Sequence, residues 1–257
     1  MTLLTSFNGR YWKNYIDARV RPQFEQFGNI ALKRIIPAFD GINEEATALE
    51  QRRYTEMMET ADVPEQDYWE AGEAAADLAF NEAMNHAVML SSMRFATVNM
   101  LATSLYHLHE QQLVDLCTQV LDYWGQEGAT PNEVLDWFKK EVGIDPRTLN
   151  SWPLVEELCL VANVVKHGEG RSSKALRELR PEVFIHPSVR GTDSSHPSPR
   201  VRTPLFGQDV YVTVHEFRRY HSALVAFWTE LAEALPALTR QSQRRARSAG
   251  PLPSDGV

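Results

Sequence analysis

Residues 152–184 read WPLVEELCLVANVVKHGEGRSSKALRELRPEVF, and in this stretch helical periodicity coincides with a compact polar cluster. On a wheel of 100° per residue its apolar side chains share one narrow arc, which is the core-facing stripe of an amphipathic helix. These residues are Leu154, Leu158, Val161 and Val165. Gly168 follows, and glycine readily takes the left-handed conformation in which helices often end. The stretch therefore predicts a helix from Leu154 to His167 that packs one face into a core.

The opposite face of this helix is polar at its C-terminal end. Asn163 and His167 are i,i+4 neighbours, close enough for the amide to hydrogen-bond the imidazole and orient it. Lys166 lies on the flank of the same face. One interpretation is structural, because Lys and His in a last turn stabilise the negative end of the helix dipole. The other is chemical, because a titratable ring beside a cation can handle a phosphodiester.

A basic segment follows the helix. Between Arg171 and Arg202 there are seven Lys or Arg against three Asp or Glu, a net charge of +4 in a chain whose net charge is −8. Arg171, Lys174 and Arg177 are the first three of these cations and are candidates for binding phosphate. The asymmetry predicts a basic patch near His167.

An Asn followed by Lys-His at the end of a helix, in an all-helical chain, resembles the HEPN superfamily, whose ribonuclease members carry an Arg four to six residues before a His. His167 matches the family's His, and Asn163 matches the polar residue that commonly follows its Arg. The Arg itself is missing, because positions 160–163 hold Leu, Val, Ala and Asn. Lys166, or Arg171 beyond the helix, would have to replace that cation. The resemblance covers this helix and the general helical plan.

The resemblance implies a metal-independent endoribonuclease in the role of a toxin or phage-defence effector. In that scheme His167 acts as base or acid, Lys166 holds the developing charge, and Asn163 orients the ring or the phosphate. It further implies a homodimer, with the polar face of the helix at a two-fold interface. The alternative is a non-catalytic HEPN-like helical binding or assembly module, which the missing Arg and the acidic N-terminal region favour.

We expect one helical domain over residues 1–238 and a disordered basic tail over residues 239–257. Within the domain, a long helical hairpin is expected over 23–124 and the HEPN-like part over 130–237. The last helix is amphipathic and is expected to stop at Pro236.

Proline and glycine mark the breaks that we expect in the hairpin. Pro37 would break or kink the first run, and Asp40-Gly41 marks a turn, so that one bent helix and two helices both remain open. The second run, residues 65–124, lacks proline and is predicted to be helical. Its continuity is open too, because a break near 81–85 or 91–92 would divide it sensibly.

The second half of the chain contains a helix start and an irregular segment. Residues 130–133, Thr-Pro-Asn-Glu, match a capping box that opens a short helix through Lys140. Residues 185–204 are rich in Pro, Ser, Gly and Thr and predict a loop. The alternation in residues 208–214, QDVYVTV, is typical of a short strand, in a small hairpin or a pinned extended segment. The predicted fold class is therefore an all-α helical bundle with long N-terminal helices and a small irregular or β insertion near 185–214.

The N-terminal hairpin carries most of the acid. Between Glu44 and Glu82 there are twelve Asp or Glu against Arg52 and Arg53, a balance of −10. Nucleic acid would avoid this face. A solvated acidic surface and a docking surface for a protein partner are both consistent with the pattern.

Composition places the chain among ordinary globular proteins. At 257 residues with 43% hydrophobic and 23% charged residues it can bury a sizeable core. No signal peptide and no run of about 18 apolar residues is visible, so no membrane association is expected. Cys117 and Cys159 are too few and too far apart for a disulfide framework, which makes the reducing cytoplasm the expected location.

Several common enzyme classes leave no trace in the sequence. It contains no phosphate-binding Walker loop, dinucleotide fingerprint, nucleophile elbow or zinc-finger spacing. His107 and His109 diverge by about 200° on a helix and cannot grip one metal together. A Glu-x-x-His motif of the di-iron type is absent as well. We therefore expect neither a cofactor nor a metal.

Overall fold

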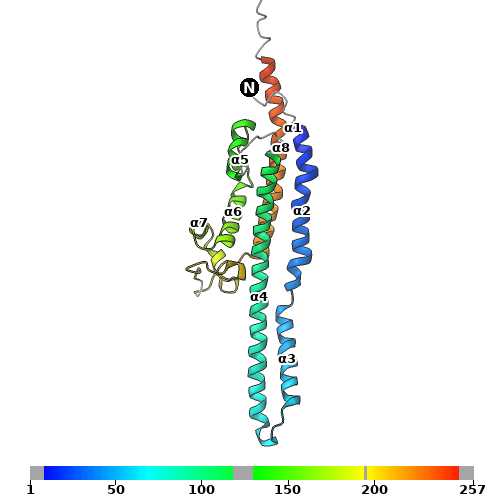
Figure 1. The fold of residues 1–257 in the computed structure, drawn as a ribbon, viewed down its shortest axis with the longest axis vertical. Helices are drawn as coiled ribbons and strands as arrows, with labels where there is room; N and C mark the ends of the chain where they lie inside the picture. Colours follow the sequence, from blue (N-terminus) through cyan, green and yellow to red (C-terminus); the bar gives the residue numbers. More distant parts are fainter. Residues whose placement is uncertain (1–8, 118–129, 194–195, 249–257) are drawn as a thin grey trace, which may run out of the picture. The chain divides into compact units, whose positions relative to one another are not determined.

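The computed structural model of the chain describes residues 9–117, 130–193 and 196–248. All of the regular structure in these ranges is helical, which confirms the all-α fold class (Figure 1). The α-helices are α1 (Gly9–Tyr15), α2 (Arg21–Ile30), α3 (Ile42–Thr60), α4 (Tyr68–Asp115), α5 (Pro131–Trp137), α6 (Trp152–His167), α7 (Arg171–Leu179) and α8 (Val214–Ser248). Short 3₁₀ and π segments join several of them. None of the described helices combines the length and the apolar character that crossing a membrane requires.

The chain divides into two compact units that do not follow its order. Unit 1 takes its described residues from Met1–Ile30, Ala102–Asn163 and His215–Val257, and unit 2 takes them from Ala31–Leu101 and Val164–Val214. The predicted hairpin over 23–124 and the predicted HEPN-like part over 130–237 each contribute to both units. The reason is that two long helices, α4 and α6, continue from one unit into the other.

Unit 1 is built around aromatic side chains of α8. The Trp228 ring lies 5.9 Å from that of Phe24 on α2 and 5.6 Å from that of Phe227, and all three side chains are fully buried. A glycine lets α2 and α8 approach, because a Cβ at Gly28 would lie 2.2 Å from Nε2 of His221. The His221 ring contacts the Phe24 carbonyl oxygen instead, at 2.9 Å. α2, α8 and the C-terminal part of α4 accordingly lie side by side (Figure 1).

In unit 2, α3 runs along the N-terminal part of α4 (Figure 1). Of the two alternatives left open at Pro37 and Gly41, one bent helix or two helices, the structure has two: Gly41 has φ of +80° and α3 begins directly after it. The contacts between the helices include Arg53 Nε, which donates to Glu82 at 2.8 Å, and His86 Nε2, which lies 2.9 Å from Glu45 Oε1. No residue of α3 is buried. This helix therefore gains little from apolar packing.

α4 is one unbroken helix of 48 residues, so the break considered near 81–85 or 91–92 is absent. The predicted end of the helix near Trp124 lies outside the described residues. The capping box of α5 is confirmed, because the Thr130 N–H donates to Glu133 at 2.7 Å and the Glu133 N–H donates to the Thr130 hydroxyl at 3.4 Å.

The region near 185–214 is irregular and contains no strand among its described residues. The alternation of QDVYVTV instead marks a pinned extended segment, in which Val210 and Val212 are buried. Its backbone bonds the side chain of Asn99 on α4: Asn99 Nδ2 donates to the Val210 carbonyl at 2.9 Å, and the Val212 N–H donates to Asn99 Oδ1 at 3.2 Å. A buried amide thus replaces the neighbouring strand that the pattern predicted.

The end of the chain differs from prediction. α8 continues through Pro236 to Ser248, so residues 239–248 are helical and the predicted disordered tail is wrong for this part. Residues 249–257 lie outside the described residues. Proline removes one helical hydrogen bond, but the Ala, Leu, Gln and Arg residues on both sides are strong helix formers.

Candidate functional site

α6 ends as its sequence predicted. The Gly168 N–H donates to the Val164 carbonyl at 2.8 Å, and Gly168 adopts φ of +69°. A Cβ at this position would lie 3.2 Å from the Val201 carbonyl oxygen. Glycine is therefore favoured by the left-handed conformation, and a side chain here would also press on the loop that contains Val201.

The two residues before Gly168 are available to a ligand. Lys166 and His167 are exposed, and neither side chain makes a hydrogen bond or ion pair with the part of the chain that the structure describes. Asn163 is half-buried, and its Nδ2 donates to Cys159 Sγ at 3.5 Å, one turn earlier in the helix. The Asn163 amide is thus engaged with a thiol rather than with the His167 ring. The catalytic roles assigned to these residues stay predictions.

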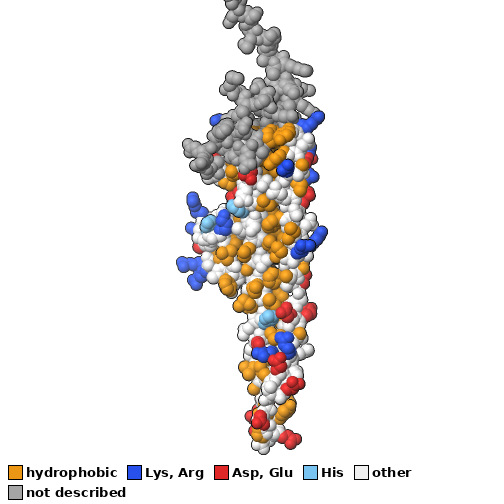
Figure 2. All heavy atoms as spheres, turned by 45° about the vertical axis from the view of Figure 1, so that its right-hand side comes forward, with side chains coloured by type: hydrophobic (Ala, Val, Ile, Leu, Met, Phe, Trp, Pro, Cys, Tyr) orange, Lys and Arg blue, Asp and Glu red, His pale blue; other side chains and the backbone are white. Residues whose placement is uncertain are grey.

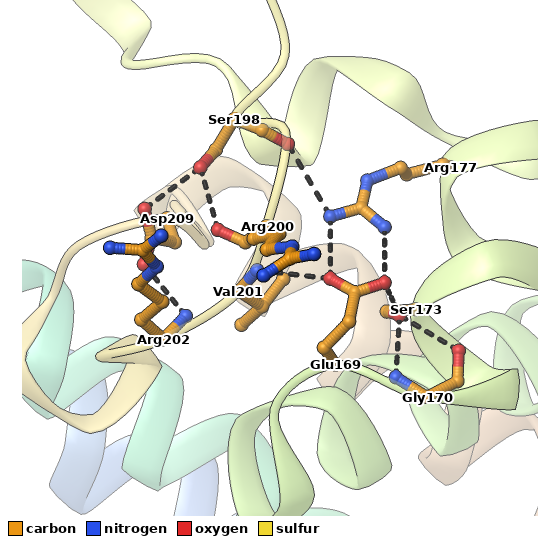
Figure 3. Close-up of polar contacts among 9 residues, drawn as sticks. All are labelled: Glu169, Gly170, Ser173, Arg177, Ser198, Arg200, Val201, Arg202 and Asp209. Carbon is orange, nitrogen blue, oxygen red and sulfur yellow. Dashed lines mark hydrogen bonds and ion pairs between the residues drawn. The ribbon is translucent and has the colours of Figure 1, made fainter.

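A carboxylate that the sequence reasoning missed organises the turn after α6 (Figure 3). Glu169 accepts from Arg177 Nη1 and Nη2 at 2.8 and 2.9 Å, from the Ser173 hydroxyl at 2.8 Å, and from the Val201 N–H at 3.0 Å. The bonds from Arg177, followed by the one from Val201, lower the pKa of Glu169 to about 2. Glu169 is consequently ionised at neutral pH and holds a loop 32 residues away in the sequence.

This arrangement determines what Arg177 can do. Besides its pair with Glu169, its guanidinium lies 4.7 Å from the centre of the Phe184 ring and donates to the Ser198 carbonyl at 3.3 Å. A guanidinium held in this way positions the loop and has little capacity left for phosphate. Of the three residues predicted to bind phosphate, Arg177 is therefore the one whose guanidinium is occupied by contacts within the protein.

A second missed carboxylate, Asp209, shapes the same loop (Figure 3). It adopts φ of +67° and accepts from the Ser198 hydroxyl at 2.8 Å and from the N–H groups of Arg202 and Thr203 at 2.9 and 3.2 Å. Partial burial by itself raises the pKa of Asp209. The hydrogen bonds from the Arg202 N–H and the Ser198 hydroxyl lower this pKa by more, so that it lies below the usual value. The pattern Gly-Gln-Asp after a proline turn was the available signal, since Asp tolerates this backbone conformation.

The two carboxylates bring together cations from separate parts of unit 2. Glu169 and Asp209 hold residues 198–203 against the turn between α6 and α7. The exposed cations that result form what we name the basic surface: Lys166, Arg171, Lys174, Arg200 and Arg202. Their side chains make no hydrogen bond or ion pair within the described ranges, while the nearby Glu169 is neutralised by Arg177. Arg200 and Arg202, at the far end of the predicted basic segment, thus belong to the same surface as Arg171 and Lys174.

No family model, curated protein or solved structure matches this chain. The HEPN resemblance therefore rests on the residues of α6. Among the described residues, no group of three or more His, Cys, Asp or Glu side chains is arranged to hold a metal ion. What the site offers is positive charge, one exposed imidazole and a loop held in place by two carboxylates.

Proposed function

We propose that the chain is a HEPN-like helical module that binds RNA through the basic surface. The observation that carries this proposal is the set of five exposed cations, none of which is paired within the described structure. Exposed Lys and Arg side chains without internal partners remain free to contact phosphate groups. Their binding to RNA is favourable mainly because it releases the counterions that surround the phosphates. Arg200 and Arg202 lie on a loop that is already ordered by Glu169 and Asp209, which lowers the entropy cost of binding.

The charge distribution orients the nucleic acid. The basic segment lies within a chain of net charge −8, and the acidic residues between Glu44 and Glu82 repel a polyanion. RNA is thereby directed to the basic surface and away from α3 and the start of α4. A cytoplasmic location, a homodimer and a role as toxin or phage-defence effector stay predictions that accompany this proposal.

Fluorescence anisotropy with a labelled single-stranded RNA of roughly 20 nucleotides tests the proposal. The double variants Arg171→Ala/Lys174→Ala and Arg200→Ala/Arg202→Ala should each lose at least about tenfold in affinity at low salt, because each removes two phosphate contacts. The slope of log K against log salt should fall by about 1.4, since each contact to a single strand contributes about 0.7.

The matched control is Lys33→Ala/Arg34→Ala, which removes the same charge from two exposed cations of unit 2 outside the basic surface. It should bind nearly as the wild type does. Equal losses in all three variants would mean that only net charge matters, and an absence of binding at low salt would refute RNA binding altogether.

A second candidate function, metal-independent cleavage of the bound RNA, is favoured by one observation. His167 is exposed and unpaired within the described residues, and it adjoins Lys166 of the basic surface. An imidazole can remove the 2′-hydroxyl proton or protonate the leaving oxygen, and an ammonium group can stabilise the phosphorane. This scheme requires no metal and leaves cyclic-phosphate ends.

Cleavage is tested by incubating the purified protein with RNA in EDTA. His167→Ala should lower the rate by at least about a hundredfold, the usual size of a general acid–base effect, without changing RNA affinity by more than about twofold. His215→Ala, which removes an exposed imidazole from the start of α8, serves as control. Binding without cleavage by the wild type, or equal cleavage by both variants, would leave the chain as a non-catalytic binding module.

A further inference from the structure

A groove of about 880 Å³ lies entirely within unit 2, and none of the five cations of the basic surface lines it, although Asp209, which bonds the backbone of Arg202, does. It is bounded by the start of α3, by residues 84–95 of α4, and by the irregular segments around 186–188 and 207–211. Neither the proposed RNA binding nor the proposed cleavage uses it.

Part of the groove lining is an aromatic and aliphatic cluster. Phe95 packs edge-on against the rings of Tyr211 and His186, with centroids 5.3 and 5.4 Å apart. Met84 and Val88 line the groove on the same face of α4, and their exposed fractions are 48% and 58%. Met84 adds adaptability, because an unbranched thioether side chain can fit differently shaped partners.

The apolar face continues beyond the groove. Phe80 is 49% exposed and precedes Met84 by four residues, so Phe80, Met84 and Val88 form a stripe with i, i+4, i+8 spacing. Single exposed apolar side chains are common on protein surfaces. Three large ones next to each other on one helix face form a contiguous apolar patch, and such patches usually mark interaction sites. A stripe with this spacing beside a groove is the shape into which an amphipathic helix lays its apolar face.

Acidic side chains surround this stripe. Asp40 and Glu44 line the groove, and the exposed Glu73 and Asp77 lie seven residues before Phe80 and Met84 on the same face of α4. Among the described residues that line the groove, Arg94 is the one Lys or Arg. Figure 2 shows hydrophobic side chains interspersed with Asp and Glu on the surface of the α3–α4 hairpin. The charge complement of this surface is a basic one.

We propose that the groove and the Phe80–Met84–Val88 stripe bind a basic amphipathic helix of a partner protein. Apolar residues of that helix at i and i+4 pack on Met84 and Val88, and its Lys or Arg residues pair with Asp40, Glu44 and Asp77. Charge argues against a second copy of the same hairpin. The segment from Glu44 to Glu82 has twelve Asp or Glu and only two Arg, so two copies of it would repel each other. The same acids repel RNA.

The test uses a fluorescein-labelled synthetic helix of about 18 residues made of Leu, Ala and Lys, whose Leu residues share one face. Two further peptides are controls: a scrambled one of equal composition without an apolar face, and one with Glu in place of Lys. The wild-type protein should bind the first peptide at least about tenfold more tightly than either control, because only it matches both the stripe and the charge.

Two variants of α4 locate the binding. Met84→Asp/Val88→Asp should weaken binding at least about tenfold, whereas Met93→Asp/Met100→Asp, which changes two equally exposed methionines elsewhere on α4, should stay within about twofold. Asp40→Asn/Glu44→Gln should reduce both the affinity and its dependence on salt. Binding of RNA by the basic surface should be unaffected in all of these variants, so failure here is distinguishable from failure of the proposed function.

Three results would overturn the inference: equal binding of the scrambled peptide, equal effects of the two α4 variants, or no binding of the amphipathic peptide. Light scattering tests the remaining possibility, that a second copy of the chain occupies the groove. A doubled mass of the wild type that Met84→Asp/Val88→Asp returns to the monomer value would assign the groove to a second copy and refute a partner helix.

Discussion

At the scale of the residue, Asn99 shows how a single side chain replaces secondary structure. It is fully buried on α4, and its Nδ2 donates to the carbonyls of Pro204 and Val210 while its Oδ1 accepts from Val212. Asn99→Ala would leave these backbone groups without partners in the interior. We expect a loss of about 3 kcal/mol in the free energy of unfolding, from the cost of burying unsatisfied polar groups. Urea denaturation followed by circular dichroism measures this.

The comparison for Asn99→Ala is Asn85→Ala, an exposed position of the same helix with no hydrogen bond to other described residues. Its free energy of unfolding should change by less than about 0.5 kcal/mol, as is usual for surface substitutions. If both variants lost the same stability, the effect would reflect helix propensity and the role given to Asn99 would be wrong.

At the scale of the element, α3 and α4 illustrate two ways in which a helix is maintained. α4 runs for 48 residues on good helix formers, with Gly72 as the single glycine within its bounds, and it contributes to both units. α3 has no buried residue, and its described contacts to α4 include the Arg53–Glu82 and His86–Glu45 pairs. Exposed ion pairs contribute little to stability. Because α3 is weakly packed and lies beside the exposed Phe80–Met84–Val88 stripe, we expect this part of unit 2 to contact another protein.

At the scale of the whole molecule, His109 links stability to pH. It is 2% exposed, its Nδ1 has no hydrogen-bond partner among the described residues, and the rings of Tyr106, Phe227 and Trp228 lie 4.8 to 6.0 Å away. Burial lowers the pKa of His109 to about 3. Between that value and about 6.5 the unfolded chain binds one more proton than the folded chain, so stability falls as pH falls, by up to about 1.4 kcal/mol per pH unit.

Urea denaturation at pH 7.5 and at pH 5.5 measures this dependence. The wild type should lose stability between the two values, and His109→Leu, which fills the same apolar site without a titrating group, should lose distinctly less. An equal loss in both proteins would assign the pH dependence to other groups, such as His186, whose pKa partial burial also lowers.

Local signals accounted for much of the fold. The apolar arc of α6, the glycines at 41 and 168, and the Thr130–Glu133 capping box each act over a few residues, and each was predicted correctly because the interaction is contained in its own segment. Lys166, Arg171 and Lys174 are exposed at the end of α6 and on α7, and their role in binding phosphate stays a prediction. Composition and periodicity alone were sufficient for the all-α class.

Long-range contacts account for the rest. Glu169 bonds Val201 and occupies Arg177, and Asp209 bonds the backbone of Arg202, so the loop with Arg200 and Arg202 is held near α7. The sequence places these cations in the basic segment but does not signal which carboxylate bonds which partner. Asn99 bonds a segment more than 100 residues away and so converts a strand-like pattern into a pinned loop. Helix ends and apolar faces follow from neighbours along the chain, whereas the partners of a carboxylate or an amide depend on which distant segments folding brings within hydrogen-bond distance.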